Sequence, residues 1–322
     1  MLRTRIIDEQ VTGWQRQGRI RFHIGSLGEE CCIIASACAL RASDWIFPSY
    51  REFGALLMRG MPLREYLGNL FGNAHDPAKG RQMPDHYTGK PFNFGCVSSP
   101  IATQIPQAVG FAYASRLRNE GAVIAAYFGD GATSSGEFHA GLTLAGVLKT
   151  PNVFLLRNNG WAISCPNERQ CAVRALSDKA HGYGIRGVRC DGNNAEETYL
   201  TVLEAVEHAA HGRGSTLVEM VASRQGGHST ADDPRLYRSP EEEARGLKED
   251  PVARLRQRLR LLEAWSDDEE HQLRQAVAEE LVEELREAEL ASPPTLEGLF
   301  DDVYAHLPEH LREQREKALR FA

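Results

Sequence analysis

Two short polar motifs in the middle of the chain have residue types that could bind a phosphorylated ligand through a metal ion. Gly129-Asp130-Gly131 follows one apolar run, and Asn158-Asn159 follows the next. Carboxylate and amide oxygens are suitable ligands for magnesium, which usually keeps phosphate oxygens in its coordination shell. The glycines on either side of Asp130 allow the backbone to approach a phosphate closely. The two motifs together therefore predict a site for a diphosphate cofactor that is bound through magnesium.

Two other phosphate-binding motifs fit this region poorly. A P-loop requires lysine after its second glycine, and Glu137 occupies that position. The dinucleotide fingerprint requires a third glycine, where the chain has Ser134. A kinase-like nucleotide-binding enzyme is therefore disfavoured. Purely structural roles also exist: Asp130 could cap the following helix, and the two asparagines could form a turn with positive φ.

These motifs lie in a region where predicted strands alternate with predicted helices. Continuous apolar runs bounded by glycine or polar residues predict buried strands, and the longer segments between them predict helices. Ser134 and Glu137 have the spacing of a capping box at the start of the first of these helices. The alternation predicts an α/β fold with a mostly parallel sheet, helices on both faces and ligands at the carboxyl ends of the strands. The predicted strands are 122–128, 152–157, 187–190 and 215–222, and the predicted helices are 137–149 and 195–211.

A change of composition near residue 240 predicts a second region. We expect an α/β domain over 1–240 and a helical C-terminal extension over 241–322 that packs on the core and on partner subunits. Leu273, Val277, Leu281 and Leu285 recur every four residues and predict one apolar stripe on a helix. Residues 164–180 and 224–240 are expected to be loops, and Ser292-Pro293-Pro294 should interrupt the helical region.

The composition limits the possible partners and compartment. The net charge of −7 and the lack of a basic patch disfavour nucleic acid, and no apolar run is long enough to cross a membrane. The seven cysteines show no metal-like spacing and fit a reducing compartment. The N-terminal residues are too charged for a signal peptide, so we expect a cytoplasmic protein.

Several further motifs extend the comparison to a known family. In chain order they are GRQMPDHY, SSPIATQIPQAVG, FGDGATSSGEFHAG, RNNGWAIS, HGYGI, GGHSTADD and YRSP. Together they resemble the alpha subunit of thiamine diphosphate-dependent 2-oxo acid dehydrogenases, and the likeness is greatest to the branched-chain type. The resemblance implies the thiamine diphosphate-binding fold and oxidative decarboxylation of a 2-oxo acid, with transfer of the acyl group to a lipoyl group on an acyltransferase core.

The resemblance also implies a role for each matching residue. Magnesium would be held by Asp130, Asn159 and the carbonyl of Trp161, and the diphosphate by Gly131, Ala132, Tyr50, Arg51 and Arg157. Ser99 and Ile101 would contact the organic part of the cofactor, and His228 would line the active site as a proton donor or acceptor. Taken alone, a loop histidine such as His228 is more often simply solvated. A monovalent cation such as potassium would be bound by Ser98, Pro100, Thr103 and Gln104.

Relatives of this kind need a second chain. A glutamate of the beta subunit activates the cofactor, and this sequence has no beta-like domain, so the resemblance implies an α2β2 heterotetramer. The substrate is expected to be a branched-chain 2-oxo acid, with pyruvate or acetoin as alternatives. A non-catalytic scaffold subunit with the same fold is a further alternative, which the presence of Asp130, Asn159 and His228 disfavours.

Overall fold

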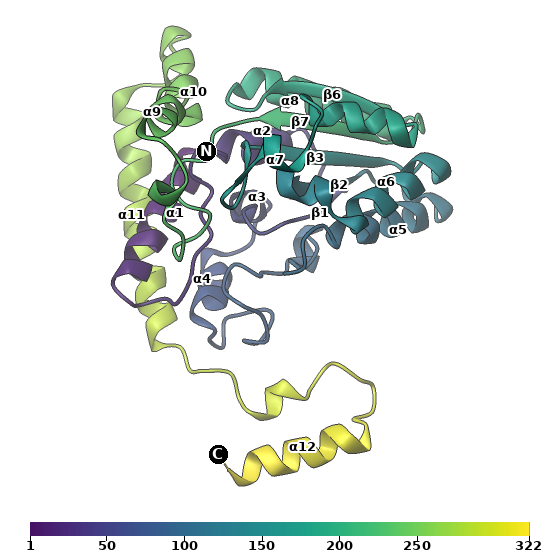
Figure 1. Cartoon of the computed structure of the whole chain (residues 1–322). Coiled ribbons are helices and arrows are strands. Elements are labelled where there is room, and N and C mark those ends of the chain that lie inside the picture. Colours follow the sequence, from purple (N-terminus) through teal and green to yellow (C-terminus); the bar gives the residue numbers. More distant parts are fainter. Residues whose placement is uncertain (322) are drawn as a thin grey trace.

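The computed structural model describes residues 1–321, and a parallel β-sheet forms the centre of this described part (Figure 1). Its five strands lie in the order β1-β2-β3-β7-β6, and every neighbouring pair is parallel. In the central pair, Ile124 lies opposite Asn152 and Gly129 lies opposite Arg157. The strands are β1 (Trp45–Phe47), β2 (Ile124–Gly129), β3 (Asn152–Asn158), β7 (Thr216–Val221) and β6 (Arg186–Asp191).

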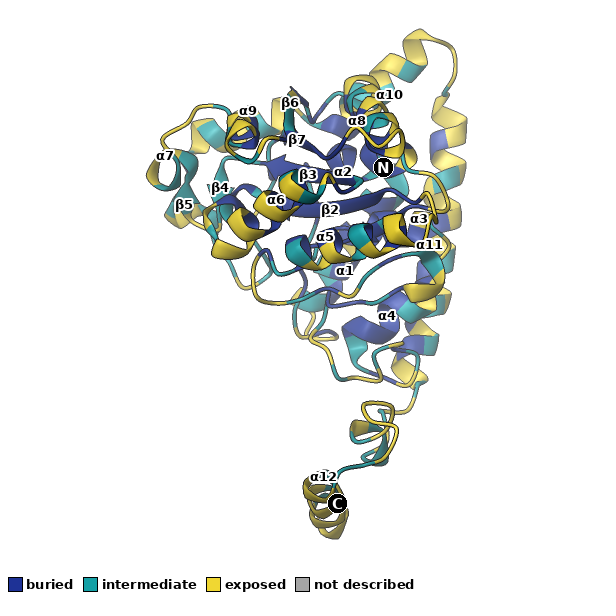
Figure 2. Ribbon diagram, turned by 90° about the vertical axis from the view of Figure 1, so that its right-hand side faces the viewer, coloured by how far each residue is buried: buried dark blue, intermediate teal, exposed yellow. Residues whose placement is uncertain are grey.

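Helices cover both faces of the sheet, which confirms the predicted α/β architecture (Figure 2). Successive strand residues point to opposite faces, so β2 contributes Tyr127 to one core and Phe128 to the other. Because both faces are buried, these strands are apolar almost throughout rather than alternating. One face packs against α1 (Leu2–Arg16), α2 (Glu30–Cys38) and α8 (Ala195–Ala210), and the other against α5 (Gln104–Leu117) and α6 (Gly136–Leu148).

Short elements connect these layers. Two further helices, α3 (Phe53–Met58) and α4 (Leu63–Phe71), lie between β1 and β2 in the chain. The segment after β3 forms a small antiparallel pair, β4 (Trp161–Ala162) and β5 (Cys165–Pro166), followed by α7 (Asn167–Gln170). The 3-10 turns are η1 (Lys90–Phe92), η2 (Asp130–Ser134), η3 (Leu176–Tyr183), η4 (Pro234–Leu236) and η5 (Glu297–Leu299).

The structure corrects two local predictions. The capping box expected between Ser134 and Glu137 is wrong: Ser134 belongs to η2, and the Ser135 hydroxyl accepts a hydrogen bond from the Phe138 amide at 3.2 Å. The η2 turn extends to Ser134, so the helix cap falls on Ser135, one residue later than predicted. The segment expected to be a loop over 164–180 instead contains β5, α7 and the start of η3.

The C-terminal region is helical, as predicted, and its first part packs on the α/β core. Val277, Leu281 and Leu285 are buried where α11 meets α1 and α4, and Leu273 is partly buried, which confirms the apolar stripe. Figure 1 shows α12 standing apart from the rest, and none of its residues is buried. The domain boundary at residue 240 stays a prediction, and residue 322 lies outside the described part. The helices are α9 (Pro240–Lys248), α10 (Pro251–Leu261), α11 (Asp267–Leu290) and α12 (Glu309–Arg320).

Candidate active site

A cavity of about 360 Å³ lies at the carboxyl ends of β2 and β3. Ligands commonly bind at this edge of a parallel sheet, because the loops that follow the strands meet there. The structure brings most of the predicted site residues to its wall, but Ser98, Ser99, Pro100 and Thr103 do not line it. The predicted residues that do line it are Tyr50, Arg51, Ile101, Gln104, Asp130, Gly131, Ala132, Arg157, Asn159, Trp161 and His228.

Asp130 is a buried carboxylate without a cationic partner. It is the first residue of η2, directly after β2, and it is only 1% exposed. Oδ2 accepts a hydrogen bond from the Gln170 amide at 2.9 Å, and no ion pair to Asp130 forms within residues 1–321. Burial, and then the charge of Glu29, raise the pKa of Asp130 to about 6. Such a carboxylate is suited to a bound cation, which would restore its charge.

Asn158 and Asn159 are adjacent at the end of β3 but have different surroundings. Asn158 is buried, and its amide group contacts Glu219 at 2.7 Å and Asn167 at 2.7 Å. Asn159 lines the cavity, and its Oδ1 accepts a hydrogen bond from the Trp161 amide at 3.0 Å. A carbonyl oxygen has a second lone pair, so this turn contact leaves Oδ1 able to bind a cation. The positive φ, 82°, falls on Gly160 and not on either asparagine.

Gly131 allows the short strand β4 to approach η2 closely. A Cβ atom at this position would lie 2.7 Å from the Cβ of Ala162. Real side chains do not tolerate that separation, so any larger residue would push β4 away from the turn that carries Asp130. The glycine therefore keeps Trp161 and Ala162 at the cavity wall.

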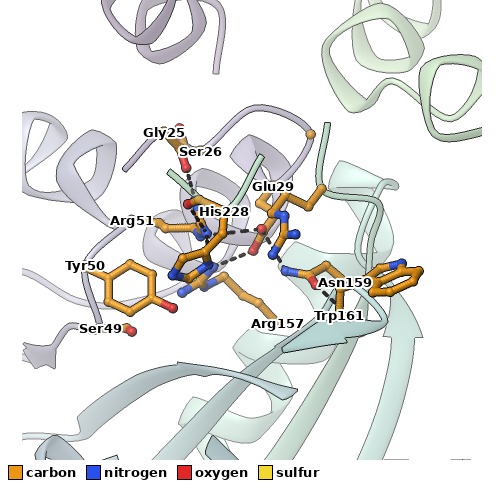
Figure 3. A network of polar contacts seen from close by, with 12 residues as sticks. Gly25, Ser26, Glu29, Ser49, Tyr50, Arg51, Arg157, Asn159, Trp161 and His228 are labelled. Carbon is orange, nitrogen blue, oxygen red and sulfur yellow. Dashed lines mark hydrogen bonds and ion pairs between the residues drawn. The ribbon is translucent and has the colours of Figure 1, made fainter. Parts of the chain in front are cut away.

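A buried network of ion pairs joins Glu29 and Glu52 to arginines of the cavity wall, and Figure 3 shows the part around Glu29. Glu29 is fully buried and accepts hydrogen bonds from Arg157 and, at 3.0 Å, from the Asn159 amide. Arg157 also pairs with Glu52 at 2.8 Å. Burial alone would raise the pKa of Glu29, but the charges of Arg157, Arg51 and Arg224 hold it below its usual value. Glu29 therefore orients the side chains of Asn159 and Arg157.

Glu29 and Glu52 are not among the predicted site residues. Glu29 precedes a second glutamate at the start of α2, where acidic residues are common for reasons of helix stability alone. Glu52 precedes α3 in the same way. Their involvement depends on contacts with Arg157, more than 100 residues away in the chain, and no local pattern reports such contacts.

The protonation state of His228 follows from its hydrogen bonds. One Arg51 nitrogen donates to Nδ1 at 3.0 Å and to the His228 carbonyl at 2.8 Å. Because a guanidinium can only donate, Nδ1 must be the acceptor and the proton must be on Nε2. Burial, then Arg51 and Arg224, lower the pKa of His228 to about 4. The Tyr50 ring lies edge-on to the imidazole at 5.6 Å, so Tyr50 and Arg51 fix a neutral histidine at the cavity (Figure 3).

The wall has groups for both an anion and a cation: its arginines can donate hydrogen bonds to an anion, and Asp130 can bind a cation that accompanies it. Three arginines and one carboxylate, Asp130, line the cavity. Glu29 and Glu52 pair with Arg157, and Glu29 also pairs with Arg51, whereas no ion pair to Arg224 forms within the described residues. The Nε atoms of Arg157 and Arg224 have no hydrogen-bond partner among the described atoms. Residues 1–321 contain no cluster of three or more histidine, cysteine or acidic side chains that could hold a metal alone. These residues therefore fit a magnesium ion whose remaining ligands are phosphate oxygens.

The residues expected to bind a monovalent cation are only partly brought together. The Thr103 hydroxyl donates to the Pro100 carbonyl at 3.0 Å, while the Gln104 amide donates to the Tyr127 carbonyl at 2.8 Å. Ser99, expected to contact the cofactor, is hydrogen-bonded to His86 at 2.6 Å. The cation role of these residues stays a prediction.

A family model described as "Dehydrogenase E1 component" matches residues 1–297. The chain belongs to the dehydrogenase E1 component family. Membership of this family implies thiamine diphosphate as the cofactor, and the fold and cavity are consistent with that.

Relatives with established names are similar over nearly the whole chain. The mitochondrial alpha 2 subunit of 2-oxoisovalerate dehydrogenase of Arabidopsis thaliana is 44% identical over 315 residues, which is 98% of this chain and 67% of the relative. The corresponding mitochondrial alpha subunit of Mus musculus is 41% identical over 307 residues, 95% of this chain and 70% of the relative. That of Homo sapiens is 41% identical over 307 residues, 95% of this chain and 69% of the relative. The chain thus spans about two thirds of the length of these E1 relatives.

These comparisons contradict the expected cytoplasmic location, because all three relatives are named as mitochondrial proteins. That expectation depended on the cysteine pattern and on the lack of a secretory signal, and neither distinguishes the cytoplasm from a mitochondrion. Within residues 1–321, none of the helices combines the length and the apolar character that a membrane crossing requires.

Proposed function

We propose that this chain is the alpha subunit of a thiamine diphosphate-dependent 2-oxoisovalerate dehydrogenase. It would decarboxylate a branched-chain 2-oxo acid and help to pass the acyl group to a lipoyl group on an acyltransferase core. The observation that carries this proposal is the meeting of Asp130 and Asn159 at one cavity that Arg51, Arg157 and Arg224 also line. The names of the relatives favour the branched-chain substrate over pyruvate or acetoin, and favour an enzyme over a scaffold subunit.

The wall residues could hold each part of the cofactor. Asp130, Asn159 and the Trp161 carbonyl would bind magnesium, while Gly131, Ala132, Tyr50, Arg51 and Arg157 would face the diphosphate. Arginine is suited to this task because its planar group donates two hydrogen bonds at once. Ile101 would contact the organic rings, and the same role for Ser99 would require a cofactor that reaches beyond the cavity wall, which Ser99 does not line. When bound, thiamine diphosphate supplies a ring that accepts the electrons left by the departing carbon dioxide.

His228 would act beside the reacting atoms. Arg51 holds its Nδ1, so its protonated Nε2 is the nitrogen that can donate to an oxygen in the cavity. A neutral histidine can donate this hydrogen bond without adding a further positive charge beside the three arginines. We expect it to orient the substrate or to move a proton during acyl transfer.

The proposed assembly is an α2β2 heterotetramer. Ile101 is 48% exposed although it lines the cavity, so the cavity wall has an open side at this point. A beta subunit covering that side would exclude water and would provide the glutamate that activates the cofactor. Isolated alpha chain is therefore expected to be inactive.

The test is a substrate panel with the chain reconstituted with its beta partner. 2-Oxoisovalerate, other branched-chain 2-oxo acids, pyruvate and acetoin would be compared by kcat/KM with ferricyanide as electron acceptor. We expect the branched-chain acids to be preferred by at least about tenfold, since one or two extra carbon atoms in an apolar pocket are worth that much. Equal activity on all compounds, or activity without the beta subunit, would refute the proposal.

A further inference from the structure

A buried histidine lies between two aspartates beneath the loop that carries His228. His23, Asp8 in α1 and Asp85 are all fully buried. Nε2 of His23 lies 2.9 Å from Asp8, and Nδ1 lies 3.0 Å from Asp85. Because carboxylates only accept, both ring nitrogens must donate, so His23 is an imidazolium. Burial opposes this charge, but Asp85 and Asp8 outweigh it and raise the pKa of His23 to about 10.

The two aspartates also bind the main chain on either side of Gly25. Asp8 accepts hydrogen bonds from the Ser26 amide and, at 2.9 Å, from the Ser26 hydroxyl. Asp85 accepts from the Ile24 amide at 2.6 Å. A Cβ atom at Gly25 would collide with the Asp8 carboxylate, so this contact requires glycine. The aspartates therefore hold this segment from the interior at three positions, His23, Ile24 and Ser26.

The outer side of the same segment holds the active-site loop. The His23 amide donates to the Thr230 hydroxyl at 3.0 Å, and the Thr230 amide donates to the His23 carbonyl at 2.9 Å. The Gly25 carbonyl accepts a hydrogen bond from Arg51, whose other nitrogen holds His228 (Figure 3). Two routes thus lead from the buried ion group to His228, one through Thr230 and one through Arg51.

A cavity borders the loop on one side, so these hydrogen bonds restrain it where fewer side chains pack against it. A second cavity, of about 590 Å³, lies on its other side and is lined by His23, Gly25, Gly226, Gly227 and Thr230. His228 itself lines the first cavity. The loop therefore runs between two cavities, and Gly226, with a φ of 83°, has open space where a side chain would stand.

We propose that His23, clamped by Asp8 and Asp85, is a positioning residue that fixes the loop of His228 through Thr230 and the 23–26 main chain. Its neutralisation would leave two buried carboxylates facing each other, and the segment they hold would shift. The task of the positioned loop rests on the proposed function, whereas the contacts around His23 do not depend on it.

A double-mutant cycle tests this inference. The full chain would be prepared as wild type, His23→Gln, Thr230→Val and the double variant. Thr12→Val is the control, because Thr12 lines the second cavity and no side-chain hydrogen bond joins it to the loop within residues 1–321. The first readout is the rate of tryptic cleavage after Arg235, whose side chain is 81% exposed, in the chain alone. The second is the dissociation constant for thiamine diphosphate in the complex with the beta subunit, measured by calorimetry.

We expect faster cleavage and about tenfold weaker cofactor binding for His23→Gln, which corresponds to about 1.4 kcal/mol. The double variant should resemble His23→Gln alone, because residues that act through one contact are not additive. Additive effects, or a lower unfolding midpoint with unchanged cleavage and affinity, would overturn the proposal.

Thr230→Val keeps the buried ion group, so it decides the matter if His23→Gln does not fold. It should accelerate cleavage while the unfolding midpoint stays close to that of Thr12→Val, and wild-type cleavage would overturn the inference. A wild-type complex that binds no thiamine diphosphate would refute the proposed function instead, and the cleavage rates would still decide the role of His23.

Discussion

At the scale of single residues, the site contains two titratable groups whose pKa values are shifted in opposite senses for one main reason. Burial disfavours charge in both, so it raises the pKa of Asp130 to about 6 and lowers that of His228 to about 4. A magnesium ion beside Asp130 would reverse the first shift, because a divalent cation favours the carboxylate. The second shift would remain, since Arg51 and Arg224 are part of the chain.

The buried His23 should make the stability of the chain fall at alkaline pH. Its folded pKa, about 10, exceeds its unfolded value, so the folded state binds more protons between the two. The stability from this group is complete below about pH 6.5 and is lost as the pH rises through about 10. Three polar groups surround the His23 ring and its partners: Asp8 on α1, Tyr66 on α4, and Asp85, which accepts a hydrogen bond from Tyr66. The Phe53 ring packs edge-on against the imidazole.

Denaturant unfolding of wild type and His23→Gln over this range measures the effect. Between about pH 7 and 9, wild type should lose up to about 1.4 kcal/mol of unfolding free energy per pH unit more than the variant. Parallel pH profiles for the two proteins would show that His23 is not charged in the folded state.

At the scale of elements, α11 attaches the C-terminal region to the α/β core through one face. Leu281 is 2% exposed against this core, whereas its neighbour Val282 is 71% exposed. Leu281→Ala should therefore lower the unfolding free energy by about 2–5 kcal/mol, because it removes buried methyl groups and leaves a cavity. Val282→Ala is the matched control and should change it by less than about 0.5 kcal/mol. Equal effects in urea unfolding would contradict this packing.

The sequence predicted elements well where burial imposed a pattern. The strands around residues 124–129, 152–158 and 216–221 are covered on both faces, so their apolar runs were distinctive. β1 was missed because its three residues are too few to show a period. The capping serine was assigned one residue early, because Ser134 and Ser135 are chemically alike and only the length of η2 distinguishes them.

The site was predictable only as far as its local motifs extended. Asp130 and Asn159 follow adjacent parallel strands, so their meeting could be expected from the topology. Glu29, Glu52 and Arg224 reach the site through long-range contacts, and each fits an ordinary role in its own segment. His23 was not predicted to have a role for the same reason, because its partner Asp85 is 62 residues away in the chain.

At the scale of the whole molecule, the described chain has the features expected of one half of a shared active site. It contains the residues that fit a magnesium-bound diphosphate and the histidine beside them, and the cavity reaches the half-exposed Ile101. The projecting α12 has no buried residue of its own. These features are consistent with a subunit that functions inside a larger assembly, as the names of its relatives state for those proteins.

The most direct test of this account is a calorimetric titration of thiamine diphosphate into the reconstituted complex, with magnesium and with a chelator in its place. Wild type and the control Asp301→Ala, which alters an exposed carboxylate, should bind the cofactor only when magnesium is present. Asp130→Ala should show no saturable binding under either condition, because the ion would lose its only carboxylate ligand from this chain. Wild-type affinity in Asp130→Ala, or binding that does not depend on magnesium, would contradict the account.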